Sequence, residues 1–249
     1  MTDRSLTPRS VPELYGGRYV VRPAERYGQA TPEDSRLRGT GRVADDLWLM
    51  AHDDRTGRAL LKPRQLGLGL AGGLLADLFL GGRAGLGADG TIRPASRAHR
   101  VPAADAADAA LLELMAAEPI PLPVRDWLRF LAARAAEQVG ARLEDAGYLT
   151  TVRRRVRWLP GRLIPGDPDW AITPISRAGM ALDPRRPASP HACALVGLAT
   201  ACGLGFRLDQ YLTHARTVPD AVQLLPPDVR ALIAATAAAA ASAVLSHRT

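Results

Sequence analysis

Lysine, aromatic residues and cysteine are scarce in this sequence of 249 residues. Lys62 is its only lysine, so the formal net charge of +7 rests on arginine. Aromatic residues make up only 5%, which leaves Leu and Ala to fill the interior and favours helices over a sandwich of sheets. The two cysteines, Cys193 and Cys202, lie in an apolar segment without a further thiol nearby, which argues against a disulfide framework and a zinc site.

The sequence also lacks an apolar segment that clearly marks a targeting signal or a membrane span. No N-terminal apolar run resembles a signal peptide. The Ala-rich stretch Ala231–Leu245 is short and weakly hydrophobic for a bilayer span, and Arg230 and His247 flank it. We therefore expect a protein that is soluble or attached to a membrane peripherally.

Residues that could form a catalytic or metal site are few and scattered. None of the five histidines pairs with cysteine or carboxylate at the spacing of metal ligands; they are His52, His99, His191, His214 and His247. The nearest approach, His191-Ala192-Cys193, is interpreted as the start of an apolar helix. No G-x-S-x-G, Walker or paired-carboxylate pattern occurs. We expect a protein that is not an enzyme and that holds neither metal nor cofactor.

The excess of positive charge, with a pI near 10.2, suggests attraction to an anionic partner such as nucleic acid, an acidic lipid surface or an acidic protein. Much Ala, Gly and Pro accompanies the arginine, a bias typical of a GC-rich coding genome. Residues 1–42 hold eight Arg and five acids, with scattered Pro and Gly and no sustained periodicity. We interpret residues 1–42 as a basic, disordered tail and residues 43–249 as one domain.

The stretch Leu66–Leu80 predicts the element around which the domain is built. Leucine recurs in it at helical spacing, so it is interpreted as a central buried helix, ended by Gly81 and Gly82. Four internal glycines weaken a helix unless other elements pack closely on its bare backbone. Three of them spell G-x-G-x-x-G, but the preceding residues 62–65 cannot form the buried strand that a dinucleotide site needs.

The other segments predict a mainly α fold: a single helical domain around the central hydrophobic helix, with two or more short β-hairpins. One hairpin is expected at residues 87–92, with its turn at Ala88-Asp89-Gly90, and another at 148–165. Helices are expected at about residues 43–51, 104–118, 123–146, 169–182, 190–204, 208–214 and 226–246.

The hairpin at Tyr148–Pro165 is the most informative polar feature. Its arginines are Arg153, Arg154, Arg155, Arg157 and Arg162, and its apolar tip is Trp158-Leu159. Alternation along a strand places Arg153, Arg155 and Arg157 on one face. Such a hairpin fits a membrane contact in which the arginines lie on an anionic surface and Trp158 and Leu159 insert. A tip packed against its own domain or a second subunit is the other interpretation.

The order of helix, glycine stop and basic hairpin occurs twice and also suits a winged-helix nucleic-acid binder, whose wing arginines would bind phosphates. The expected recognition helices have few side chains that read bases. Leu66–Leu80 offers only Asp77, and the helix at 123–146 becomes acidic towards its end. Nucleic-acid binding therefore stays the alternative.

Four motifs in order resemble the Golgi phosphoprotein 3 family, and more specifically an actinobacterial member. They are D-D-L-W-L-M-A-H-D-D-R-T-G-R at 45–58, G-L-L-A-D-L-F-L-G-G-R-A-G-L at 73–86, V-R-D-W-L at 124–128 and R-L-E-D-A-G-Y-L-T at 142–150, followed by the Arg-rich hairpin. The resemblance covers residue 43 to the C-terminus. It implies a mostly helical single domain.

In eukaryotic members of that family, a basic pocket binds phosphatidylinositol 4-phosphate, a hydrophobic hairpin dips into the bilayer, and the non-enzymatic protein retains glycosyltransferases in the Golgi. An ungapped alignment places the family's headgroup tryptophan at Lys62 and its arginines at Ala71, Ala133 and Ala136, so none of the four is kept. Lys62, Arg64 and Arg134 lie beside those positions and are the expected headgroup-binding residues.

The resemblance thus implies a cytoplasmic protein, peripheral on the inner face of the membrane, that binds anionic phospholipid and serves as an adaptor or scaffold for membrane-associated enzymes. Nucleic acid is not an expected partner, and the sequence leaves the oligomeric state and the lipid headgroup open.

Overall fold

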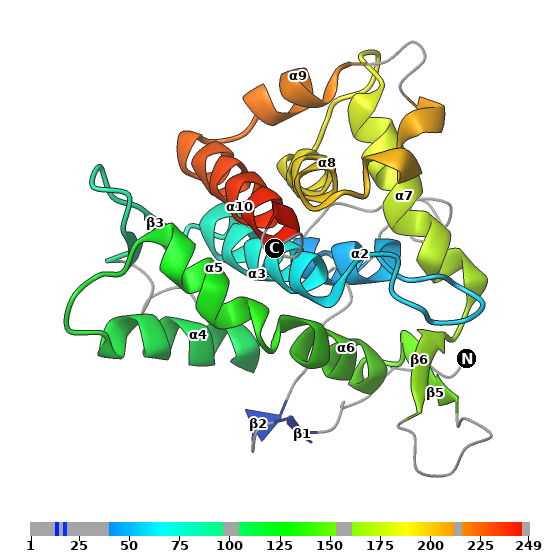
Figure 1. The fold of residues 1–249 in the computed structure, drawn as a ribbon, viewed down its shortest axis with the longest axis horizontal. Coiled ribbons are helices and arrows are strands. Elements are labelled where there is room, and N and C mark those ends of the chain that lie inside the picture. The colour runs from blue at the N-terminus through cyan, green and yellow to red at the C-terminus, as the bar shows by residue number, and fades with distance from the viewer. Residues whose placement is uncertain are drawn as a thin grey trace, which may run out of the picture.

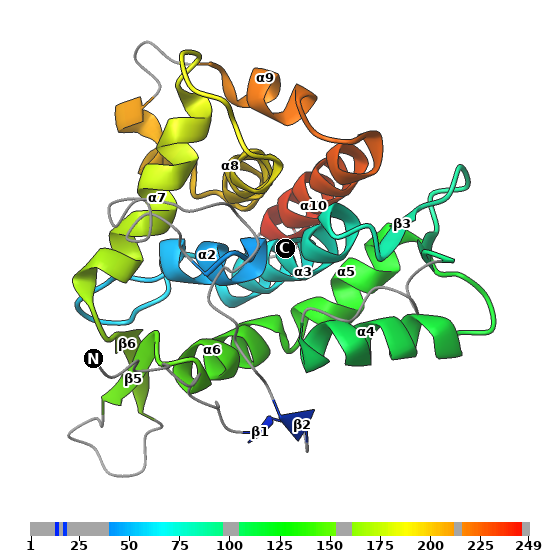
Figure 2. The same cartoon turned by 180° about the vertical axis from the view of Figure 1, so that it is seen from behind.

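The structure is a computed structural model and describes residues 13–14, 17–18, 40–96, 105–152, 161–211 and 216–245. Figures 1 and 2 show that helices form the body of the molecule. The helices are α2 (Val43–Met50), α3 (Pro63–Leu80), α4 (Ala106–Ala117), α5 (Val124–Ala132), α6 (Ala135–Asp145), α7 (Pro168–Leu182), α8 (Pro190–Cys202), α9 (Val218–Gln223) and α10 (Pro227–Leu245), with 3₁₀ turns η1 (Gly205–Arg207) and η2 (Asp209–Tyr211). The mainly α fold predicted from the sequence is confirmed.

The strands form short antiparallel pairs at the edges of this body. They are β1 (Glu13–Leu14) with β2 (Gly17–Arg18), β3 (Ala84–Leu86) with β4 (Ile92–Pro94), and β5 (Leu149–Val152) with β6 (Arg162–Pro165). The β3–β4 and β5–β6 hairpins lie at opposite ends of the molecule (Figures 1 and 2). Both were predicted from the sequence.

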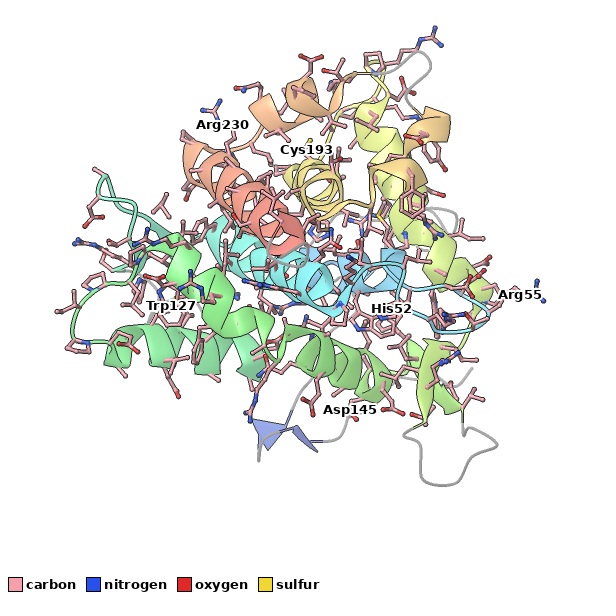
Figure 3. All side chains as sticks on the ribbon, viewed as in Figure 1. His52, Arg55, Trp127, Asp145, Cys193 and Arg230 are labelled. Carbon is pink, nitrogen blue, oxygen red and sulfur yellow. The ribbon has the colours of Figure 1, made fainter. Side chains whose placement is uncertain are left out.

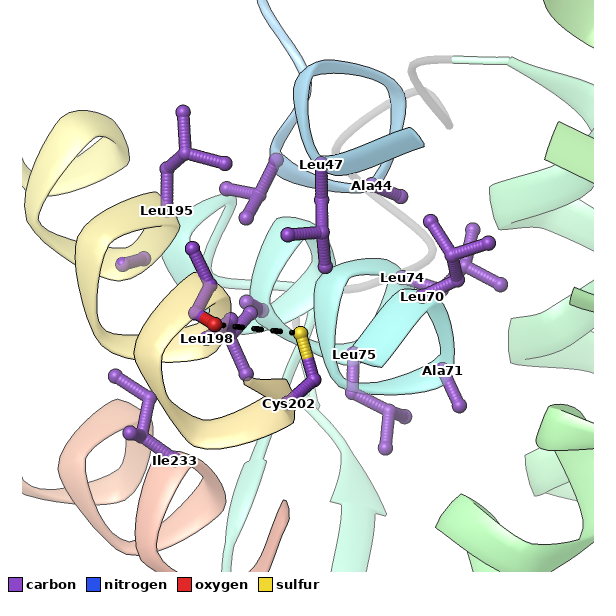
Figure 4. Close-up of a cluster of buried hydrophobic side chains, with 14 of the residues drawn as sticks. Ala44, Leu47, Leu70, Ala71, Leu74, Leu75, Leu195, Leu198, Cys202 and Ile233 are labelled. Atoms are coloured by element: carbon purple, nitrogen blue, oxygen red, sulfur yellow. Dashed lines mark hydrogen bonds between the residues drawn. The ribbon is translucent and has the colours of Figure 1, made fainter. Parts of the chain in front are cut away.

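Helix α3 is the central element, as the leucine spacing predicts. Pro63 occupies its first turn, where the missing N–H costs no hydrogen bond, and Gly82 follows its end with a φ of 64°. Helices α2, α5, α8 and α10 all pack against it. Figure 4 shows side chains of α2, α8 and α10 around α3, with Leu70, Ala71 and Leu75 fully buried.

The glycines of α3 are the points where these neighbours approach. A Cβ on Gly67 would lie 2.3 Å from the carbonyl oxygen of Ala132 in α5, and one on Gly73 would lie 2.7 Å from the Cα of Ala44 in α2. Gly69 and Gly72 face α8, and Gly72 also meets Thr236 of α10. The glycine pattern therefore serves helix packing inside α3, in agreement with the rejection of a dinucleotide site.

Two helix predictions need correction. Residues 123–146 form two helices, because the chain breaks at Ala133 and Arg134, where Arg134 has φ −125° and ψ −7°. The local sequence is Ala-rich and favours a helix, but the Ala132 carbonyl is pressed against the backbone of Gly67, so packing against α3 overrides propensity. The predicted helix at 208–214 is only the turn η2 in its described part, and the sequence missed α9.

Helix α10 corrects a further expectation. It is 19 residues long and, within the described residues, is the one helix long and apolar enough to cross a membrane, with a mean hydropathy of 1.5 over its most apolar window. The stretch Ala231–Leu245 alone is short for a bilayer span, but the helix begins four residues earlier, at Pro227. Its inner face, including Leu232 and Ile233, packs on α3, α5 and α8. This face belongs to the core of the domain.

Buried ion pairs fix the helices around α3. Asp45 and Asp46 lie in the first turn of α2, and both are buried. Arg142 donates to Asp45 from Nε at 3.0 Å, which ties α6 to α2, and Arg177 donates to Asp46 at 2.7 Å, which ties α7 to α2. Burial raises the pKa of Asp45, and Arg142 opposes this shift.

Arg42, the last residue of the predicted tail, contacts the helical domain. It is mostly buried, pairs with Asp105 and Asp108, and lies 3.7 Å from Asp77. These contacts join the start of α2 to α3 and α4. Most of residues 1–39 lie outside the described part of the chain, so the predicted boundary at residue 42 stays a prediction.

Candidate functional site

The three predicted headgroup residues lie around the N-terminal end of α3. Lys62 is the residue before the helix, Arg64 lies in its first turn, and Arg134 connects α5 to α6; all three are exposed. Arg64 and Gly67 are three residues apart, so they share a helix face. Because Gly67 touches Ala132, that face meets the α5–α6 junction, and the structure brings the two segments that carry these cations together.

The backbone around these residues also favours anions. The N-cap residues of α3 and α6, Lys62 and Arg134, make no side-chain hydrogen bond to the first turn of their helices. The helix dipole makes both of these ends positive. Glu137, exposed in the first turn of α6, lowers this local potential.

Aspartates pair with the partly buried arginines, but not with every exposed cation. Within the described residues, no ion pair involves Lys62 or Arg134, whereas the partly buried Arg42, Arg142 and Arg177 all pair with aspartate. Positive charge at the end of α3 is thus available to an anion outside the protein.

The β5–β6 hairpin lies next to α6, the helix that follows Arg134. Its strands pair from Leu149 with Pro165 to Val152 with Arg162. The predicted membrane-surface residues Arg153, Arg154, Arg155 and Arg157, and the predicted inserting residues Trp158 and Leu159, lie outside the described residues.

Arg162 is the one predicted membrane-surface arginine that the structure describes. It is half-buried, and its Nη1 donates a hydrogen bond of 2.9 Å to the carbonyl of Thr56 in the loop between α2 and α3. This contact holds the hairpin to the loop, a role that strand alternation could not predict.

No feature of the sequence singled out the loop after α2, so two exposed cations in it were missed. Arg55 and Arg58 are exposed, and Figure 3 shows Arg55 at the edge of the molecule. Hydrogen bonds from Thr56 lower the pKa of Asp53, which stays ionised and fixes the turn. The available signal was two arginines within seven residues of Lys62.

His52 lies at the base of this loop and is buried. Its ring stacks on Trp48 with a centroid distance of 3.7 Å, and Nδ1 donates to the Trp48 carbonyl at 2.7 Å. Burial lowers the pKa of His52, and the hydrogen bond to Trp48 partly opposes the shift. The neutral imidazole is therefore favoured, which makes it a structural support.

A comparison with protein families decides the affiliation. Residues 43–244 match the family described as Golgi phosphoprotein 3 (GPP34). The chain belongs to the Golgi phosphoprotein 3 family. No curated protein matches this family member.

The family pocket positions differ in their surroundings in this Golgi phosphoprotein 3 family member. Ala71, aligned with a family arginine, is fully buried in the core, so a long cationic side chain has no room there. Ala133 is exposed and Ala136 is half-buried at the α5–α6 junction, close to Arg134. The cations at the N-terminal end of α3 are therefore Lys62, Arg64 and Arg134, which lie at other positions in the sequence than the family's arginines.

The winged-helix alternative is not favoured. The helix that precedes the β3–β4 hairpin is α3, which is surrounded by α2, α5, α8 and α10 and cannot enter a DNA groove.

Among the described residues no cluster of potential metal ligands occurs, and Cys193 and Cys202 are buried free thiols.

Proposed function

We propose that this Golgi phosphoprotein 3 family member is a peripheral membrane protein that binds anionic phospholipid headgroups, phosphoinositides among them. Lys62, Arg64 and Arg134 contact the headgroup at the end of α3. The Arg-rich hairpin lies on the membrane surface, and its tip, Trp158-Leu159, inserts into the leaflet.

The observation that carries this proposal is the meeting of two cationic segments at one helix end. Contact between Gly67 and Ala132 joins them, and Lys62 and Arg134 have no carboxylate partner among the described residues. The N-terminal ends of α3 and α6, which their N-cap side chains do not cap, add the positive helix-dipole potential that favours phosphate.

The magnitudes suit reversible attachment. Each basic side chain near an anionic leaflet contributes about 1 kcal/mol, and this falls as salt rises. A buried Trp or Leu adds roughly 1.5–3 kcal/mol when fully removed from water. A few such contacts hold a protein on a membrane without the permanence of a spanning helix.

The wider role that we infer is that of an adaptor or scaffold. It is non-enzymatic, acts on the cytoplasmic face of the membrane and organises membrane-associated enzymes. Membership of the family supports this inference, and the chain offers no catalytic motif in its sequence.

The test is co-sedimentation with phosphatidylcholine vesicles that contain no anionic lipid, phosphatidylserine or phosphatidylinositol 4-phosphate, over a salt series. We expect binding to both anionic vesicles that weakens with salt, and a loss of at least about tenfold in the Lys62→Ala/Arg64→Ala/Arg134→Ala variant. Preference for one anionic lipid at equal charge would identify the headgroup.

The matched control is Arg125→Ala/Arg185→Ala/Arg186→Ala, which removes the same charge at exposed sites elsewhere. If both variants lost vesicle binding equally, the loss would be due to net charge and not to the headgroup site. Binding to duplex DNA in a shift assay, without vesicle binding, would overturn the proposal in favour of a nucleic-acid binder.

A further inference from the structure

The loop between α2 and α3, residues 53–61, connects the headgroup site to the β5–β6 hairpin. It leads directly into Lys62. Arg162 of β6 donates to the carbonyl of Thr56 at 2.9 Å, and a Cβ on Gly57 would lie 2.1 Å from the carbonyl oxygen of Leu163. The loop thus rests on β6 at one point and leads into the headgroup site at its end.

Hydrogen bonds within the loop fix its shape. The Asp53 carboxylate accepts from the N–H of Thr56 at 2.7 Å and from its hydroxyl at 2.6 Å. The N–H of Gly57 donates to the Asp53 carbonyl, and the N–H of Leu60 donates to Ala51, each at 2.8 Å. A loop held in this way presents its side chains with little ordering cost on binding.

The outer side chains of the loop are cationic and apolar. Arg55 and Arg58 are exposed, and 37% of Leu60 is exposed, whereas Asp53 and Asp54 are half-buried. Figure 3 shows Arg55 pointing away from the body of the molecule. Basic side chains beside an exposed apolar one match the headgroup layer of an anionic leaflet, where charge meets phosphate and an aliphatic group leaves water.

We propose that this loop is a second membrane contact: Arg55 and Arg58 bind lipid phosphates, and Leu60 enters the headgroup region of the leaflet. The proposal rests on the proposed function, which it extends from the end of α3 to the neighbouring loop. Gly57 is a positioning residue, because only a residue without a Cβ lets the loop lie against β6.

The first experiment measures flotation of the full chain with phosphatidylcholine vesicles that contain about one fifth phosphatidylserine, at low and high salt. Arg55→Ala/Arg58→Ala is expected to weaken binding about thirtyfold at low salt and less at high salt. The control Arg185→Ala/Arg186→Ala removes the same charge beyond the far end of α7, the helix that follows β6, and is expected to bind like the wild type.

The second experiment locates Leu60 itself. A Leu60→Cys variant carries an environment-sensitive dye, because the native Cys193 and Cys202 are 0% and 1% exposed and burial raises the pKa of Cys202 to about 12. Emission from the dye is expected to shift to the blue when these vesicles are added, and the same dye at Arg185→Cys is expected not to shift.

The outcomes separate this inference from the proposed function. If the wild type binds and Arg55→Ala/Arg58→Ala binds equally well, or loses no more than the control, the loop is not a contact. A dye at residue 60 that stays in water overturns the role of Leu60. Failure of the wild type to bind any anionic vesicle overturns the proposed function, and this inference with it.

Discussion

The two hairpins β3–β4 and β5–β6 arise from the same local pattern but have different surroundings. Each follows a helix and a glycine with positive φ, Gly82 in one case and Gly147 in the other. The β3–β4 hairpin is bonded to the segment before α5, through the N–H of Ile92 to Leu122 at 3.0 Å and the N–H of Val124 to Gly90 at 3.2 Å.

The two hairpins also differ in whether their arginines have a carboxylate partner. In β3–β4, Arg93 pairs with Asp89 at 2.7 Å, so the hairpin neutralises its own cation. In β5–β6, Arg162 donates to a carbonyl, and no ion pair involves it among the described residues. A basic hairpin therefore becomes a candidate binding element only where its charge has no internal partner, which a sequence pattern does not disclose.

The largest expected effect comes from breaking the ion pairs that hold the start of β3 to α4. Arg83, which enters β3, pairs with buried Asp108 at 2.6 Å, and Arg42 pairs with the same carboxylate. We expect Asp108→Ala to lower the free energy of unfolding by about 3 kcal/mol or more, because it removes a shared counter-charge from two buried guanidinium groups. Urea denaturation followed by circular dichroism measures the change.

The control for this prediction is Asp89→Ala, which breaks the exposed pair at the tip of the same hairpin. Its denaturation midpoint should stay close to that of the wild type. Similar midpoints for the two variants would mean that the buried pair does not anchor β3.

A second test compares two glycines with similar backbone angles. Gly57 has a φ of 60° and a Cβ position 2.1 Å from Leu163, whereas Gly90 in the β3–β4 turn has a φ of 73° and open space around it. Substitution by alanine costs about 1–2 kcal/mol at either site from the backbone angle alone. We expect Gly57→Ala to cost clearly more in thermal unfolding, and equal losses would show that the loop does not rest tightly on β6.

A third test compares one arginine from each hairpin in vesicle binding. Arg162→Ala is expected to weaken binding to anionic vesicles about fivefold, because it removes one basic side chain and the hydrogen bond that holds the hairpin to the loop with Arg55 and Arg58. Arg93→Ala should leave binding unchanged, because Asp89 already neutralises this side chain. A larger loss for Arg93→Ala would place the membrane at the other end of the molecule.

The periodicity of apolar residues predicted the central helix and most of the other helices, and turn residues with strand alternation predicted the β3–β4 and β5–β6 hairpins. The leucines of α3 are buried as expected, apart from the partly buried Leu80 at its end. Periodicity could not predict the break at Arg134, because the cause is contact with Gly67, a residue far away in sequence.

The candidate site was predictable only in part. The exposure of Lys62, Arg64 and Arg134 agrees with the expectation, but the loop with Arg55 and Arg58 gained significance only from its contact with β6. The burial of acidic residues such as Asp45 could not be predicted either, because their partners, such as Arg142, lie on helices distant in sequence. Local patterns encode helix faces, whereas charge pairing depends on the tertiary arrangement.

The smallest expected effect concerns pH. Acidification should destabilise the loop that contacts β6, which lies over His52, before it destabilises the β3–β4 hairpin. Burial lowers the pKa of His52, so the unfolded chain takes up a proton near pH 6.5 that the folded chain resists. Stability contributed by the neutral ring is therefore present above that pH and is lost as the pH falls below it.

We expect the free energy of unfolding to decrease from about pH 7 to about pH 5, and His52→Gln to reduce this slope. Hydrogen exchange should show the same order locally: on acidification the amide of Leu60, which bonds to Ala51 above His52, loses protection before the amide of Gly87 in β3–β4. Equal slopes in the two proteins, or earlier opening at Gly87, would contradict a role for His52 under the loop. The loop would then depend on Gly57 and Arg162 alone for its position, and its membrane contact would be independent of pH in this range.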